Sequence, residues 1–159
     1  MKKLLYLDVC ALSRPFDDQS YLRIRLDTEA INLILARIKE NFYEMMVSPV
    51  HIKEILAIED DIERIQLITL LNKWGKKIGV DLKRTKDRAE ELVKFGFGVA
   101  DAAHVAFAEI GGAEFISCDD KLLKKCRRYK IKIWCGTPLN FCDKEDLRWG
   151  KLDIWMKIH

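Results

Sequence analysis

Short apolar runs alternate along this chain with longer stretches in which apolar residues recur every three or four positions. Residues 3–9, 44–47 and 114–118 are apolar without helical periodicity, which predicts strands buried on both faces of a sheet. Residues 21–39 carry their apolar side chains at helical spacing and predict one long helix. This alternation favours an α/β fold with a central, mainly parallel sheet flanked by helices.

Capping residues and glycines divide the rest of the chain. Ser48 and Pro49 predict the start of a helix that reaches about Ile58, and a further helix is expected to end before Gly75. The remaining expected elements are a minor strand at 80–83, a helix at 85–95, a small-residue helix from Val99, a basic helix at 119–129 and a strand at 131–134.

Length and composition indicate one soluble globular domain. The chain has 159 residues, 49% hydrophobic and 33% charged, which is room for one core and far from a disordered composition. We expect a domain over residues 1–142 and a tail over 143–159 that packs on it or on a second copy. The net charge is only +3, so binding to a polyanion requires a local basic patch.

The opening of the chain superficially imitates a signal peptide. Asp8 interrupts the apolar run after four residues, and no stretch reaches the roughly 18 apolar residues of a membrane span. We therefore expect a cytoplasmic protein without a membrane partner. The cysteines are odd in number, form no C-x-x-C pair and are expected to be reduced core thiols: Cys10, Cys118, Cys126, Cys135 and Cys142.

Four acidic residues stand where predicted elements begin or end. Asp8 and Asp119 follow predicted strands, whose carboxyl ends hold the ligands of open α/β sheets. Asp101 lies in the first turn of its helix, and Glu54 lies within the helix that Ser48 opens. Each alone has a structural explanation, as a cap, a dipole partner or a solvated side chain. Converging carboxylates repel one another unless a cation lies between them, so the set of four predicts a metal site.

Oxygen ligands of this kind suit Mg²⁺ or Mn²⁺, which deprotonate a bound water and neutralise charge on a phosphoryl oxygen. The residues therefore predict hydrolysis of a phosphodiester. Ser117, two residues before Asp119, would point to the same side and could orient a carboxylate or a water, and Asp120 is a second supporting candidate.

Four segments resemble the acidic motifs of the PIN-domain family, in order and with suitable spacing, within residues 3–139. They are residues 7–12, 48–55, 100–106 and 115–122. The resemblance, closest to small prokaryotic VapC-like members, implies a PIN-like three-layer sandwich and a Mg²⁺- or Mn²⁺-dependent endoribonuclease. It also implies a homodimer and, in many relatives, the toxin of a VapBC-type pair with an antitoxin partner.

On the family pattern, the metal-binding and catalytic residues are Asp8, Glu54, Asp101 and Asp119, with Ser117 at the hydroxyl position of the last motif. Many relatives carry a polar pair after the first aspartate. Here Val9 and Cys10 stand instead, which removes a hydroxyl near the metal.

Basic residues supply candidate contacts to the RNA backbone. Lys121, Lys124 and Lys125 follow Asp119, and Arg14 lies just beyond Asp8. A solvated helix face is the alternative explanation of the lysines. His51 and His104 are interpreted as structural histidines bonded to backbone or carboxylate, and not as general bases.

Two other functions remain open on sequence grounds. One is a catalytically degenerate PIN-like module that only binds RNA or protein. The other is a receiver-like phosphoacceptor domain, which would need an acidic pair after the first strand and an acceptor on a central strand, whereas Glu54 is expected on a helix.

Overall fold

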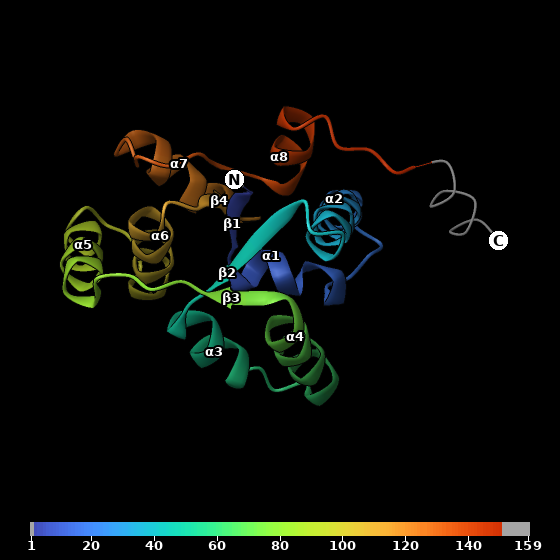
Figure 1. Ribbon diagram of the computed structural model, residues 1–159, viewed down its shortest axis with the longest axis horizontal. Helices are drawn as coiled ribbons and strands as arrows, with labels where there is room; N and C mark the ends of the chain where they lie inside the picture. Colours follow the sequence, from blue (N-terminus) through green and yellow to red (C-terminus); the bar gives the residue numbers. More distant parts are fainter. Residues whose placement is uncertain (1, 151–159) are drawn as a thin grey trace.

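Five parallel strands form the centre of the protein. Figure 1 shows the computed structural model, which describes residues 2–150. The strand order is β3-β2-β1-β4-β5, so β1 lies in the middle and pairs in parallel with both β2 and β4. The strands are β1 (Lys3–Leu7), β2 (Tyr43–Val47), β3 (Gly75–Lys77), β4 (Glu114–Ile116) and β5 (Cys135–Gly136).

Helices connect successive strands, as the βα alternation of the sequence predicts. Their bounds are α1 (Val9–Ser13), α2 (Leu22–Lys39), α3 (Pro49–Leu56), α4 (Asp61–Trp74), α5 (Leu82–Lys94), α6 (Val99–Gly111), α7 (Asp120–Arg128) and α8 (Pro138–Lys144), with a 3-10 turn at Arg14–Phe16.

The alternation of side chains along β1 divides the core into two layers. Leu5 and Leu7 join a cluster with residues of α2, α4 and α8, whereas Tyr6 joins a second cluster with residues of α5, α6 and α7. Each large apolar side chain buried in these layers contributes about 1.5–3 kcal/mol. The result is a three-layer α/β sandwich, which confirms the predicted fold class.

The third strand and the following helix differ from the prediction. Residues 80–83 do not form a strand, because Asp81 caps α5 by accepting the Arg84 N–H at 3.1 Å. The strand lies instead at Gly75–Lys77, directly after α4. A Cβ on Gly75 would lie 2.1 Å from Cγ2 of Val47 and 2.6 Å from the Leu71 carbonyl oxygen, so only glycine permits this turn from helix to strand.

The last strand and the last helix also depart from expectation. Residues 131–134 are not a strand, although the Trp134 carbonyl accepts the Phe115 N–H at 2.8 Å just before β5 begins. Helix α8, which the sequence prediction missed, starts at the Thr137 capping box and crosses position 142. Trp149 packs against the first core cluster, and residues 151–159 of the expected tail lie outside the described residues.

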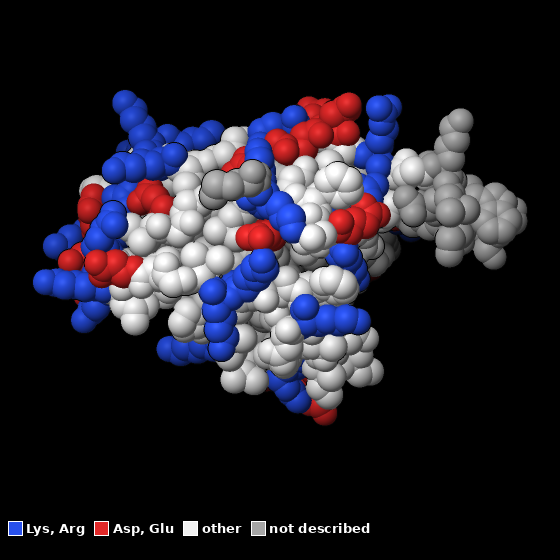
Figure 2. Space-filling model, in the orientation of Figure 1, with Lys and Arg blue, Asp and Glu red and all other residues white. Residues whose placement is uncertain are grey.

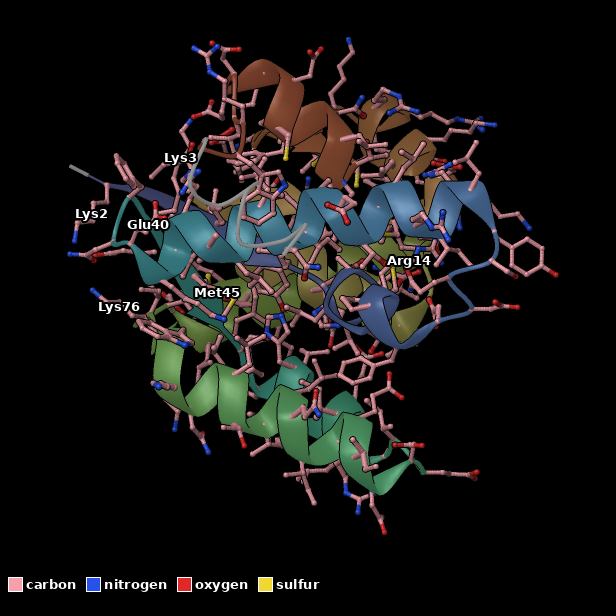
Figure 3. All side chains as sticks on the ribbon, turned by 90° about the vertical axis from the view of Figure 1, so that its right-hand side faces the viewer. Lys2, Lys3, Arg14, Glu40, Met45 and Lys76 are labelled. Carbon is pink, nitrogen blue, oxygen red and sulfur yellow. The ribbon has the colours of Figure 1, made fainter. Side chains whose placement is uncertain are left out.

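The two ends of the sandwich carry different residues. In Figure 3, Arg14 lies beside one half of α2, and Glu40, Lys3 and Lys76 lie toward the opposite end of the helix. Within residues 2–150, no helix combines the length and apolar character that crossing a membrane requires.

The five cysteines are free thiols, but Cys10 is exposed, so its assignment to the core was wrong.

Candidate carboxylate site

The predicted acidic residues lie beyond the carboxyl ends of neighbouring strands. Asp8 follows β1 directly, Glu54 lies on α3 after β2, and Asp119 lies between β4 and α7. Asp101 occupies the first turn of α6, which leads into β4. Because β1 lies between β2 and β4, these four residues belong to one edge of the sheet.

Asp8 is the most deeply buried of the four, with 4% of its surface exposed. Its Oδ1 accepts the N–H of Ala11 at 2.9 Å, so it caps α1, as the structural explanation of this residue anticipated. Burial raises the pKa of Asp8 well above its ordinary value, because a carboxylate loses solvation in the protein interior. An ionised Asp8 is therefore expensive unless a positive charge accompanies it.

Asp101 experiences the charges of two other candidates. Burial is the main cause of its raised pKa, and the negative charges of Asp119 and Glu54 raise it further. Asp119 itself caps α7, because its Oδ1 accepts the N–H groups of Lys121 at 3.0 Å and Leu122 at 3.2 Å. Electrostatically, then, the pKa of Asp101 responds to two of the other three acids.

Glu54 has a partner that the sequence did not suggest. Its Oε1 accepts a short hydrogen bond from Nε2 of His104, and this bond is the main cause of the lowered pKa of Glu54. The Glu54 side chain is still 36% exposed. His51 and His104 are both buried and bonded, to the Leu7 carbonyl and to Glu54 respectively, as expected of structural histidines.

The donor chemistry of this edge fits a hard divalent cation. Its ligands would be carboxylate oxygens. A cation would offset both the burial that mainly raises the pKa of Asp101 and the like charges that raise it further. Among residues 2–150, however, no three His, Cys, Asp or Glu side chains are grouped so that they could hold a metal ion as they stand. The acids share an edge of the sheet without forming a closed coordination cage.

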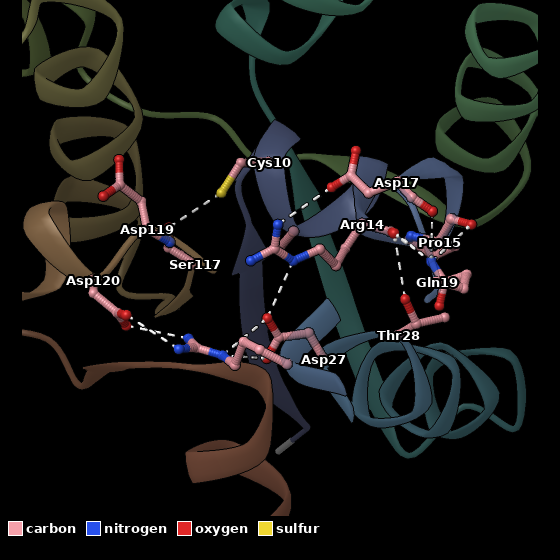
Figure 4. A network of polar contacts seen from close by, with 12 residues as sticks. Cys10, Arg14, Pro15, Asp17, Gln19, Asp27, Thr28, Ser117, Asp119 and Asp120 are labelled. Carbon is pink, nitrogen blue, oxygen red and sulfur yellow. Dashed lines mark hydrogen bonds and ion pairs between the residues drawn. The ribbon is translucent and has the colours of Figure 1, made fainter. Parts of the chain in front are cut away.

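Ser117 supports the turn that carries Asp119. It is fully buried, and its Oγ accepts the backbone N–H of Asp119 at 3.0 Å. Figure 4 shows the side chain of Cys10 facing Ser117, with 3.5 Å between Sγ and Oγ. A hydrogen bond with Cys118 is the main cause that lowers the pKa of the Cys10 thiol. Position 10 thus places a polarisable sulfur beside the last motif.

Arg14 and Asp120 belong to an ion-pair network (Figure 4). Arg14 Nε donates to the fully buried Asp27 at 3.1 Å, and its Nη1 donates to Asp17 at 3.3 Å. Arg23 donates to Asp27 as well, and it binds Asp120 through two hydrogen bonds of 3.1 and 3.2 Å. Both arginines are therefore largely neutralised, and the contact of Arg14 with nucleic acid stays a prediction.

The lysines of α7 differ in exposure and in hydrogen bonding. Lys121 and Lys124 are exposed, whereas Lys125 donates to the Gly96 carbonyl at 2.8 Å and so ties α7 to the segment before α6. Figure 2 shows Lys and Arg side chains gathered on the part of the surface formed by α7. This is the local basic patch that binding of a polyanion would require.

Lowering the pH is expected to destabilise the protein through His51. Burial is the main cause that lowers the pKa of His51 from 6.5 to about 4. Below pH 6.5 the unfolded chain therefore binds a proton that the folded protein excludes, and the free energy of unfolding falls between about pH 6.5 and 4 by up to about 3 kcal/mol. Urea denaturation at pH 7.0, 5.5 and 4.5 measures this loss.

The matched control for this pH dependence is His51→Asn, which removes the titrating ring. The raised pKa values of Asp8 and Asp101 act in the opposite direction, since they favour the folded state at low pH. Both proteins share that contribution, so the difference between their pH slopes isolates His51. Equal slopes in the parent and the variant would contradict the prediction.

Sequence reasoning missed Tyr6 and Asp27, which shape this edge, and it did not identify the partner of His104. Tyr6 lies two residues before Asp8, so the two side chains point to the same side of the sheet. In the sequence, however, Tyr6 cannot be distinguished from the other apolar residues of the strand. Asp27 lies inside the apolar stripe of α2, and an acid at a buried helix position was the available signal. His104 lies one turn after Asp101, yet nothing in its spacing indicates Glu54, 50 residues away, as its partner.

Comparison with known proteins informs the fold. No protein-family model matches the chain, and no curated protein matches it in sequence. A solved structure described as "Crystal Structure of FitAcB from Neisseria gonorrhoeae" is similar, with a TM-score of 0.53 and 12% identity. The similarity covers 85% of this chain and 98% of that one. At this identity the likeness concerns the fold alone, and the three-layer α/β architecture is consistent with the PIN-like sandwich that the resemblance of the motifs implies.

Proposed function

We propose that this protein is a Mg²⁺- or Mn²⁺-dependent endoribonuclease that hydrolyses RNA phosphodiesters in the cytoplasm. The observation that carries the proposal is the position of Asp101, whose pKa is raised by burial and by the charges of Asp119 and Glu54 at the edge where Asp8 is buried. Such a concentration of negative charge is stabilised by a bound cation.

Asp8, Asp101, Asp119 and Glu54 would hold the cation. When bound, it would supply a nucleophilic water and neutralise charge on the phosphoryl group. The Ala11 N–H fixes the orientation of Asp8, and the N–H groups of Lys121 and Leu122 fix that of Asp119, so neither side chain must be ordered during the reaction. The exposed Lys121 and Lys124 would contact phosphates of the RNA next to the site.

A protein partner of the antitoxin type fits a second surface. A cavity of about 630 Å³ lies between α3, the segment that joins β3 to α5, and α6. Its lining is largely apolar and includes Val47, Ile52, Val80, Leu82 and Phe107. Ser48 also lines it, so a partner bound there would lie next to the carboxylate edge and could regulate it. Homodimer formation is part of the same proposal.

Cleavage of a 5′-labelled single-stranded RNA tests the activity. The parent is expected to cut it with Mn²⁺ and to stop when excess chelator is added, whereas Asp8→Asn is expected to fall to the background rate. Asparagine can still cap α1, so the loss would not arise from unfolding. Asp87→Asn, on the exposed face of α5, is the matched control and should cut like the parent. Equal rates for Asp8→Asn and the parent would refute the proposal.

One observation favours a catalytically degenerate binding module as the alternative. Glu54 is already paired with His104, and the described residues contain no preformed group of three metal ligands. Titration calorimetry with Mn²⁺ separates the two functions. A degenerate module would give no saturable heat, whereas the nuclease would bind Mn²⁺ and lose that binding in Asp101→Asn.

A further inference from the structure

A buried chain of polar side chains runs from Ser48 to the candidate site. The hydroxyl of Tyr6 lies 2.7 Å from Oγ of Ser48 and 2.5 Å from Nδ1 of His104. Nε2 of His104 contacts Oε1 of Glu54. Ser48, Tyr6 and His104 are at most 3% exposed, so water does not compete for these bonds. These hydrogen bonds join β1, α6 and the start of α3, and the series ends at Glu54, the one partly exposed group among the four.

With a neutral His104 ring, the chemistry of the groups sets the direction of the hydrogen bonds among Ser48, Tyr6, His104 and Glu54. An ionised Glu54 can only accept, so Nε2 of His104 carries a proton and donates it. In the neutral ring Nδ1 is then an acceptor, and the Tyr6 hydroxyl donates to it. The Tyr6 oxygen in turn accepts from the hydroxyl of Ser48. Tyr6 thereby selects the His104 tautomer that can hold Glu54.

Glu54 needs such support, because several factors favour displacement of its carboxylate away from Asp101 and the candidate site. It lies near the end of the short helix α3, its side chain is 36% exposed, and Asp101 carries a like charge. His104 lies three residues after Asp101 on α6, so one helix presents both Asp101 and the donor that holds Glu54.

We infer that His104 is a positioning residue, held in its tautomer by Tyr6, that fixes the Glu54 carboxylate beside Asp101 for a divalent cation. The inference rests on the proposed metal-dependent function. It assigns roles to Tyr6 and His104 that the acidic motifs do not include. Hydrogen-bonded partners of metal ligands commonly change metal affinity by about 10–100-fold when they are replaced.

Two substitutions of His104 separate its two contacts. The amide of asparagine reaches the place of Nδ1 and can still meet Tyr6, whereas the longer glutamine places its amide nitrogen near Nε2 and can donate to Glu54. In titration calorimetry with Mn²⁺ on the full chain, His104→Asn is expected to weaken binding about 10–100-fold. His104→Gln is expected to recover most of that loss, a rescue that a purely packing role would not produce.

A double variant shows whether His104 acts through Glu54. In the Glu54→Gln background, adding His104→Asn should cause no further loss of Mn²⁺ affinity, since the carboxylate that His104 positions is gone. Phe141→Leu is the control for lost stability. Phe141 is buried against Tyr43 and Trp134, near the start of β2, and its replacement should leave Mn²⁺ affinity unchanged.

Nitrogen NMR of the His104 ring provides a readout without metal. The parent should show a protonated Nε2 and an unprotonated Nδ1, and Tyr6→Phe should shift both signals because Nδ1 loses its donor. The opposite tautomer in the parent, or parental Mn²⁺ affinity in His104→Asn, would overturn the inference and leave the nuclease proposal standing. Absence of saturable Mn²⁺ heat in the parent would overturn both.

Discussion

Replacing Asp101 with asparagine is expected to stabilise the metal-free protein and, at the same time, to abolish its stabilisation by Mn²⁺. The pKa of Asp101 is raised in the folded state, first by burial and then by Asp119 and Glu54. A carboxyl with a raised pKa favours folding below its unfolded value and opposes folding as the pH rises through its folded value. At pH 7 the ionised group therefore costs stability that a neutral asparagine does not.

Although the variant should be more stable without metal, it should lose the stability that the parent gains from Mn²⁺. A ligand that binds only the folded protein, at 100 times its dissociation constant, raises the free energy of unfolding by about 2.7 kcal/mol. The parent should show this gain in urea denaturation at pH 7, and Asp101→Asn should not. Asp87→Asn is again the control, with parental stability and a parental response. A variant that is less stable than the parent and still gains stability from Mn²⁺ would show that Asp101 is not a ligand.

Replacing Asp27 with alanine is expected to destabilise the protein by about 3–5 kcal/mol, the range for removing one member of a buried ion pair. Asp27 is fully buried on α2 and accepts hydrogen bonds from Arg14 and Arg23. Without it, two guanidinium groups would face each other with no charge between them. Because Arg23 also binds Asp120, the same change would loosen the contact between α2 and α7.

Urea denaturation at constant pH measures this loss, and Asp17→Ala is its matched control. Asp17 also pairs with Arg14, but its side chain is 43% exposed, so its removal should change stability by less than about 1 kcal/mol. Comparable effects of the two substitutions would mean that burial of Asp27 contributes nothing beyond a surface ion pair.

The strands and helices that hold the site were largely predictable, because their sequences carry a local signal. The apolar run of β1 ends at Asp8, and Ser48 with Pro49 marks the start of α3. Strand β3 was not predictable. Gly75 ends α4 and also begins the strand, which depends on its close approach to Val47, a contact that no local pattern encodes.

The placement of the four acids at one edge follows from their positions relative to strand ends, which the sequence reveals. The hydrogen-bond and ion-pair partners of the acidic residues cannot be predicted from the sequence in the same way. The bond between Glu54 and His104 joins residues of α3 and α6, and the two arginines meet Asp27 from different elements. Such contacts depend on how helices pack across the sheet, and therefore on the tertiary fold rather than on spacing along the chain.

The central place of β1 in the sheet has a consequence for biosynthesis. This strand is synthesised long before one of its two neighbours, β4, which begins only at Glu114. Pairing between segments so distant in sequence must wait until β4 has been made. Asp8 and Asp119 therefore cannot come together on a nascent chain that stops before β4, and the carboxylate edge assembles only after the sheet has closed around β1.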